Sequence, residues 1–296
     1  MKQVVSIEGA SFAVTNLEKV LWPKDRITKG ELIDFYVRLV PWILPHLKDR
    51  PLVLKRYPEG VGEDHFYEKR CPSYAPDWVR SWQDKTEKDQ ISYCLCQNVA
   101  TLAWLANLAD IELHVWLSTF QRPDEPTYAV FDLDPDPPSD FRDACDVALM
   151  VKEALDRLSL YAVPKTSGAG GLQIYLPLNT PHSFKEVRLF LLSLYRVIEK
   201  LLPKTVSLTH AVSERKGRVY LDYLQNVRGK SMVAVYSLRA LPGAPISAPL
   251  KWQEVKSGVS PADFNFSTIF SRLESEGDLF KDVLTVKQSV KGLRFK

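Results

Sequence analysis

The chain has 296 residues, of which 45% are apolar and 25% charged, with 39 basic against 36 acidic side chains. This composition excludes a disordered or fibrous protein, and the length suffices for one large core or two lobes. No apolar run approaches the roughly 18 residues that a membrane span needs. The N-terminus lacks the apolar stretch of a secretion signal, so we expect a soluble, cytoplasmic protein without a membrane partner.

The four cysteines do not have the spacing of a zinc site. Because a cytoplasmic chain keeps its thiols reduced, we expect all of them to be reduced core residues: Cys71, Cys94, Cys96 and Cys145.

Charge is unevenly distributed along the chain. Residues 124–156 hold ten acidic and two basic side chains, and residues 196–239 hold nine basic and three acidic side chains. The first segment could hold cations and the second polyanions, or both could be solvated faces.

Two helices are predicted in the first third of the chain. Thr28 and Glu31 form a capping box that starts the first, and Pro41 and Pro45 mark its end. Apolar residues at helical spacing predict the second over residues 97–109.

Alternating strands and helices follow residue 126. We predict a strand at 128–134, a helix capped by Ser139, strands at 161–166 and 172–178, and a helix from Ser183 to about residue 202. Three further strands are expected near 206–210, 218–224 and 232–236.

This order is the split βαβ pattern of ferredoxin-like sheets, so the fold class is α+β. We expect one domain with an N-terminal lobe (1–125), a catalytic lobe with an RRM-like or ferredoxin-like sheet (126–240) and a tail (241–296) that wraps back as a loop.

Acidic side chains on predicted strands are the first candidate site. Asp132 and Asp134 project to the same face of one strand, where their charges repel unless a cation compensates, although many such pairs are simple surface acids. Asp222 lies in another apolar strand, where burial requires a partner. Either a metal binds all three carboxylates, or Arg215 or Arg218 forms a salt bridge with Asp222.

Glycine-rich and basic segments supply further candidates. The turn at 165–171 (KTSGAGG) could cradle a phosphate or be a plain hairpin turn. Basic and aromatic residues interleave at 55–57 and 66–70, as in single-strand binding, and Asn16, Lys19 and Lys29 could form a further polar group, although each cluster could equally be a surface face. His114 lies between apolar neighbours and could be a satisfied core histidine.

Together these segments resemble the primase-polymerase domain of bacterial DNA ligase D, in the archaeo-eukaryotic primase superfamily. The resemblance covers nearly the whole chain. It rests on residues 16–23 (NLEKVLWP), 27–29 (ITK), 54–60 (LKRYPEG), 107–116 (NLADIELHVW), 131–135 (FDLDP), 166–171 (TSGAGG), 221–226 (LDYLQN) and 236–240 (YSLRA).

The resemblance implies a role for each candidate. A metal triad that binds two Mn²⁺ or Mg²⁺ ions would consist of Asp132, Asp134 and Asp222. The incoming nucleoside triphosphate would contact Ser167, Lys55, His114, Gln225 and Arg239. A 5′-phosphate on the downstream strand would bind Asn16, Lys19 and Lys29, and the template would meet Phe66, Tyr67 and Arg215.

Two departures from the family pattern stand out. The family turn reads Ser-Gly-x-Lys-Gly-Leu-His, whereas this chain has Gly170 in place of the lysine and Gln173 in place of the histidine. Arg239, Lys55 or His114 would then neutralise more of the triphosphate charge. The chain also ends without an attached ligase or nuclease, which is typical of a stand-alone polymerase or of a piece of a longer protein.

The resemblance implies a template-dependent polymerase, a nucleotidyltransferase that prefers ribonucleotides and extends 3′-hydroxyl ends at gaps and double-strand breaks in non-homologous end joining. Its partners would be DNA with a downstream 5′-phosphate, a separate DNA ligase and a Ku-like end-binding protein. Two alternatives stay open: a non-catalytic module that binds and bridges DNA ends, and a two-metal nuclease.

Overall fold

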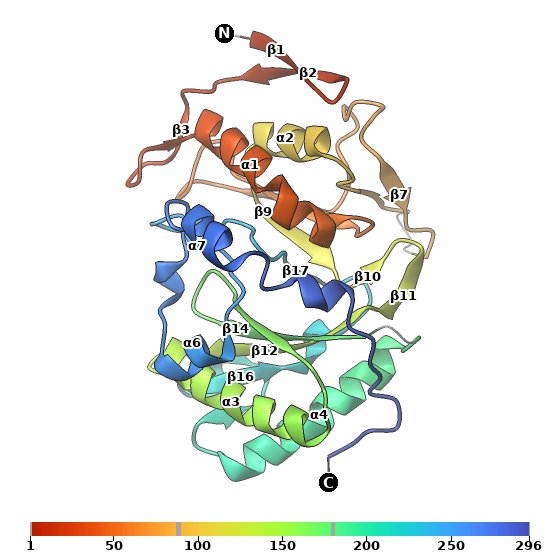
Figure 1. Cartoon of the computed structure of the whole chain (residues 1–296), viewed down its shortest axis with the longest axis vertical. Coiled ribbons are helices and arrows are strands. Elements are labelled where there is room, and N and C mark those ends of the chain that lie inside the picture. The colour runs from red at the N-terminus through yellow and green to blue at the C-terminus, as the bar shows by residue number, and fades with distance from the viewer. Residues whose placement is uncertain (1, 87–89, 179–180, 296) are drawn as a thin grey trace.

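Two β-sheets form the centre of the molecule and lie one above the other in Figure 1, with helices on their outer sides. The computed structural model describes residues 2–86, 90–178 and 181–295. The upper sheet has four antiparallel strands, in the order β17 (Ser231–Val233), β9 (Asp110–Trp116), β5 (Leu52–Arg56) and β6 (Phe66–Glu68). β5 and β9 supply its buried centre.

Helix α1 (Lys29–Leu47) covers the upper sheet and begins at the predicted capping box at Thr28. It does not end at Pro41, however, but continues through Pro45. Its inward face is buried, with Ile43 fully inaccessible, so packing outweighs the backbone hydrogen bonds that the two prolines remove. The predicted end of this helix was therefore wrong.

The second predicted helix is confirmed as α2 (Val99–Asn107), which Asn98 caps and which packs against α1. Short two-stranded hairpins surround this lobe. They are β1 (Lys2–Ile7) with β2 (Ala10–Thr15), β3 (Val20–Trp22) with β4 (Ile27–Thr28), β7 (Ser81–Gln83) with β8 (Ser92–Cys94), and β10 (Ser118–Thr119) with β11 (Arg122–Pro126).

The lower sheet has the predicted ferredoxin-like arrangement. Its strands lie in the order β13 (Val163–Thr166), β14 (Leu172–Pro177), β12 (Tyr128–Pro135), β16 (Val219–Asp222) and β15 (Val206–Ser207). All neighbours are antiparallel except β15 and β16. The strand expected near 232–236 is β17, which pairs with β9 of the upper sheet. Hydrophobic alternation predicts a strand but not which of two sheets it joins.

Helices α3 (Phe141–Arg157) and α4 (Phe184–Leu201) cover the outer face of the lower sheet (Figure 1). Asp140 rather than Ser139 caps α3, because the Ser139 hydroxyl instead donates a hydrogen bond to the Gly217 carbonyl. The capping box at the start of α4 is present as predicted. Two short elements, α5 (Val212–Arg215) and η1 (Tyr223–Gln225), flank β16.

The tail was expected to be a loop, but it contains short helices. They are α6 (Trp252–Ser257), η2 (Pro261–Asp263), α7 (Ile269–Glu276) and η3 (Lys281–Leu284). The tail runs past both sheets, in blue in Figure 1. Phe266 stacks on Phe35 of α1 with ring centroids 4.8 Å apart, and Pro249 forms a bridge with Lys165 of β13. It thus contacts both lobes.

One cysteine prediction is wrong. Cys71 and Cys94 form a disulfide, whereas Cys96 and Cys145 are buried free thiols as expected. A backbone hydrogen bond from Cys71 to Ser92 draws the first cysteine to β8. This pairing depends on tertiary contacts that cysteine spacing does not reveal. None of the helices in the described ranges combines the length and apolar character that crossing a bilayer requires.

Candidate active site

Strand pairing in the lower sheet brings the three aspartates together. Asp132 and Asp134 lie two residues apart on β12 and therefore share one face, and the Cα of Asp132 is paired directly with that of Asp222 on β16. Residues in such a pair have Cβ atoms about 4.5–5.5 Å apart. Phe131 packs against Phe190 of α4, so the aspartates occupy the opposite face, away from the helices.

No cation neutralises these carboxylates directly. Among the described residues, none of the three has a Lys, Arg or His nitrogen within 4.0 Å. The expected alternative, a salt bridge from Asp222 to Arg215 or Arg218, is absent there. The Arg215 guanidinium lies 3.9 Å from the centre of the Tyr220 ring, and Arg218 donates to backbone carbonyls.

The uncompensated charges perturb one another. Burial, together with the charges of Asp134 and Asp222, raises the pKa of Asp132 well above its usual value. Burial and the charge of Asp222 likewise raise the pKa of Asp134, against the longer-range attraction of Arg215 and Arg239. A divalent cation would relieve this repulsion.

The three carboxylates are of the chemical type that a hard divalent cation prefers, but their side chains do not form a complete metal site in this structure. Carboxylate oxygens are the ligands that Mg²⁺ and Mn²⁺ prefer, and these three carboxylates have no cationic side chain beside them. In the described part of the chain, however, no three His, Cys, Asp or Glu side chains are gathered closely enough to hold a metal. Asp222 Oδ1 instead accepts hydrogen bonds from the Tyr220 hydroxyl at 3.2 Å and the Leu224 amide at 2.9 Å.

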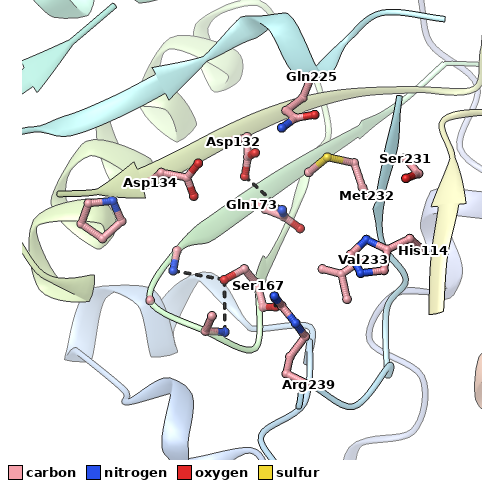
Figure 2. Close-up of a pocket in the computed structure, with 14 residues that line it drawn as sticks. His114, Asp132, Asp134, Ser167, Gln173, Gln225, Ser231, Met232, Val233 and Arg239 are labelled. Carbon is pink, nitrogen blue, oxygen red and sulfur yellow. Dashed lines mark hydrogen bonds between the residues drawn. The ribbon is translucent and has the colours of Figure 1, made fainter. Parts of the chain in front are cut away.

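A cleft of about 320 Å³ opens beside the aspartates (Figure 2). Six of the predicted residues line it: His114, Asp132, Asp134, Ser167, Gln225 and Arg239. Gly170 and Gln173, the two departures from the family turn, line it as well. Lys55 and Asp222 are not in the lining. Lys55 contacts Glu112, and Asp222 is paired with Asp132, which does line the cleft.

The glycine-rich turn packs directly against Asp134. A Cβ added at Gly171 would lie 2.8 Å from Asp134 Oδ1, so only glycine allows this approach. Ser167 Oγ accepts hydrogen bonds from the amides of Ala169 and Gly171 at 3.2 and 3.1 Å, drawn as dashed lines in Figure 2. The turn therefore lines the cleft, and two of its amides donate hydrogen bonds within the turn itself.

Three of the predicted nucleotide-binding side chains meet at one carboxylate, Glu112. Its oxygens lie 3.4 Å from Lys55 Nζ, 3.2 Å from His114 Nε2 and 3.2 Å from Arg239 Nε. Glu112 also accepts hydrogen bonds from the Tyr57 hydroxyl and the Ala240 amide, and only 2% of its side chain is exposed.

The sequence analysis did not identify Glu112 as a site residue. A signal was present, because Glu112 lies between Asp110 and His114 in an otherwise apolar strand, where a buried charge needs partners. Burial opposes its ionised form, but the hydrogen bond from His114 and the charges of Arg239, His114 and Lys55 together hold the pKa of Glu112 well below its usual range. Glu112 therefore orients Lys55, His114 and Arg239 at or beside the cleft.

The three residues predicted to bind a 5′-phosphate lie close together. The amide of Lys19 donates to the Asn16 carbonyl, and the amide of Lys29 donates to the Lys19 carbonyl at 2.8 Å. Burial and the nearby charge of Lys19 lower the pKa of Lys29 to about 8. Lys19 Nζ forms a 2.6 Å ion pair with Glu59, a partner that the sequence analysis did not foresee.

Phe66 and Tyr67 lie on the edge strand β6, each 55% exposed. The Tyr67 ring is 6.5 Å from that of His114, which places Tyr67 beside the cleft. Phe66 precedes it on the same strand, where successive side chains point to opposite faces. Arg215, the third predicted template contact, lies at the end of α5 near β16 instead.

Comparison with known proteins gives one consistent match. A sequence model described as "LigD, primase-polymerase domain" matches residues 28–280. The bifunctional non-homologous end joining protein LigD of Bacillus subtilis is 34% identical over 270 residues, which cover 90% of this chain and 43% of that protein. The multifunctional non-homologous end joining protein LigD of Mycolicibacterium smegmatis is 34% identical over 268 residues, 90% of this chain and 35% of that protein. The chain thus spans less than half the length of these relatives.

Among solved structures, the polymerase domain of Mycobacterium tuberculosis ligase D in complex with DNA is similar throughout. The TM-score is 0.85 at 29% sequence identity, and the match covers 94% of this chain and 99% of that domain.

Proposed function

The chain belongs to the family of LigD primase-polymerase domains, and on that premise we propose that it is a template-dependent nucleotidyltransferase acting in non-homologous end joining. It would extend 3′-hydroxyl ends at gaps and double-strand breaks, with a preference for ribonucleotides. The observation that carries this proposal is the division of the cleft: Asp132 and Asp134 lie on one side of it, and Arg239 and His114, both in contact with Glu112, lie on the other (Figure 2). A triphosphate with its counter-ions would lie between these two sides.

Asp132, Asp134 and Asp222 would hold Mn²⁺ or Mg²⁺. When bound there, such ions make the attacking hydroxyl more acidic and neutralise charge on the leaving phosphates. The aspartates orient the reacting ends, so catalysis rests mostly on positioning and charge neutralisation.

The opposite wall would bind the triphosphate. Arg239 is fixed by two contacts, its Nη1 donating to the Ser167 carbonyl at 2.6 Å and its Nε facing Glu112. Lys55 and His114 extend the same cluster. Since the turn has Gly170 instead of a lysine, Arg239 and Lys55 would carry the cationic contribution to nucleotide binding, and His114, whose pKa is lowered by burial, would contribute a hydrogen bond. Gln225 lines the cleft beside them.

DNA would bind outside the cleft. Lys19, Lys29 and Asn16 would hold the downstream 5′-phosphate, and the exposed rings of Phe66 and Tyr67 would stack on template bases. Arg215 would contact the template path. A separate ligase and a Ku-like end-binding protein would complete the repair reaction.

Extension of a primer in a gapped duplex tests this proposal. The wild-type chain should add a nucleotide, more readily from ATP than from dATP, and more readily when the gap carries a 5′-phosphate. Asp132→Asn should abolish addition while DNA binding persists. Binding without any addition by the wild type would indicate the non-catalytic end-bridging module, and removal of 3′ nucleotides without addition would indicate the two-metal nuclease.

A further inference from the structure

A buried lysine lies in the same cross-strand row of the lower sheet as Gln173, Asp132 and Asp222. Lys165 on β13 has no exposed surface. Its Nζ donates hydrogen bonds to Gln173 Oε1 at 2.6 Å and to Ser247 Oγ at 2.5 Å, and lies 3.5 Å from the Thr166 carbonyl. Lysine is almost never fully buried without partners, so this side chain has a defined role in the network around it.

The directions of the hydrogen bonds fix the orientation of the Gln173 amide. Ser247 Oγ donates its own proton to the Thr166 carbonyl at 2.9 Å and therefore accepts from Lys165. An amine donates, so Gln173 must present its carbonyl oxygen to Lys165. The amide nitrogen then points the other way and donates to Asp132 Oδ1 at 3.0 Å, as the dashed line in Figure 2 shows.

This arrangement forms a continuous chain from Lys165 through Gln173 to Asp132. If the Gln173 amide turned over, its oxygen would face the carboxylate of Asp132 and repel it. Burial lowers the pKa of Lys165 to about 7, against the attraction of Asp132. The two short hydrogen bonds need only two protons, which a neutral amine also has, so the chain persists in both protonation states.

Resting on the proposed function, we propose that Lys165 is a positioning residue that sets the divalent-metal affinity of Asp132 through Gln173. Lys165 holds the amide, the amide holds one carboxylate oxygen, and the other oxygen stays available to a cation. Partners of metal ligands typically change metal affinity by about 10–100-fold when they are removed.

Mn²⁺ binding without DNA or nucleotide tests the proposal, with the electron paramagnetic resonance signal of free Mn²⁺ as the readout. Lys165→Met and Gln173→Leu should each weaken binding by about tenfold or more. The double variant should bind no more weakly than Gln173→Leu, because Lys165 acts only through that amide. Lys256→Met, at an exposed position on α6, is the matched control and should bind as the wild type does.

Several outcomes would overturn the proposal: wild-type affinity in folded Lys165→Met, additive losses in the double variant, or no Mn²⁺ binding by the wild type. If Lys165→Met does not fold, as judged by circular dichroism, Gln173→Leu decides alone, and unchanged affinity in that variant refutes the linkage. Primer extension separates this inference from the proposed function. If the wild type extends primers and Lys165→Met keeps the wild-type metal affinity, only the inference about Lys165 is contradicted. If metal binding depends on Lys165 but the wild type does not extend primers, only the proposed polymerase activity is contradicted.

Discussion

Replacing Glu112 with glutamine should destabilise the protein, because this one buried carboxylate faces two cations, Lys55 and Arg239, and accepts a hydrogen bond from His114. Glutamine has the same shape and keeps one acceptor oxygen, but it loses the charge and turns an amide group toward Lys55, His114 and Arg239. These partners are themselves mostly buried, with 16–22% of each side chain exposed, so water cannot replace the lost charge.

The expected loss follows from these contacts. Removing one partner of a buried ion pair costs about 3–5 kcal/mol. The remaining carbonyl oxygen of glutamine retains one neutral hydrogen bond, which offsets about 1 kcal/mol. The free energy of unfolding of Glu112→Gln should therefore be about 2–4 kcal/mol lower than that of the wild type near neutral pH.

The difference should depend on pH with a defined sign. The pKa of Glu112 is lower in the folded chain than its ordinary value of 4.5, so the folded state favours the ionised form. The stabilisation is complete above that ordinary value and declines as the pH falls below it, because the unfolded chain then takes up a proton first. The gap between wild type and variant should narrow in acid.

Urea denaturation at about pH 7 and about pH 3.5 measures both effects. Glu153→Gln is the control, since Glu153 forms an exposed helical ion pair with Arg157 and should lose less than about 1 kcal/mol. A Glu112→Gln variant as stable as the wild type at neutral pH would refute the assignment of Glu112 as the residue that holds Lys55, His114 and Arg239 together.

Three further predictions concern the turn and the DNA-binding residues. Gly171→Ala should lower the free energy of unfolding by about 1–3 kcal/mol and weaken Mn²⁺ binding, because the added Cβ would clash with the Asp134 carboxylate. Thermal unfolding and Mn²⁺ titration measure the two effects, and unchanged values would contradict the close packing. Preference for a 5′-phosphorylated gap should fall as the pH rises through about 8, where Lys29 loses its proton, and should stay level in Lys29→Arg; a wild-type preference that rises with pH would oppose the assignment. Phe66→Ala and Tyr67→Ala should each weaken gapped-DNA binding by about 1–3 kcal/mol, measured by fluorescence anisotropy, and equal affinity would remove base stacking from the account.

Much of the lower sheet and its two covering helices could be predicted, because their signals are local. The capping box at Ser183 and the alternation at 128–134 each depend on neighbouring residues alone, and their order predicts the ferredoxin-like sheet. The path of α1 could not be predicted from Pro41 and Pro45, because burial against distant elements decides it. The disulfide and the sheet membership of β17 depend on distant contacts in the same way.

For the candidate site, too, the features that depend on neighbouring residues could be predicted, and those that depend on distant contacts could not. The spacing of Asp132 and Asp134 gives a shared face directly, whereas the position of Asp222 opposite Asp132 depends on the pairing of two strands far apart in the sequence. Glu112 and Lys165 were missed because their importance comes from side chains on other strands and loops. Residues that orient others carry little sequence signal of their own.

The direct test of the central claim is primer extension by Asp222→Asn, since Asp222 joins the other two aspartates only through the fold. Wild type and variant are compared on one gapped duplex with saturating Mn²⁺ and ATP, with folding checked by circular dichroism. We predict a loss of about 1000-fold or more in rate, which corresponds to about 4 kcal/mol of transition-state stabilisation. Extension at the wild-type rate would contradict the claim that these three carboxylates act together.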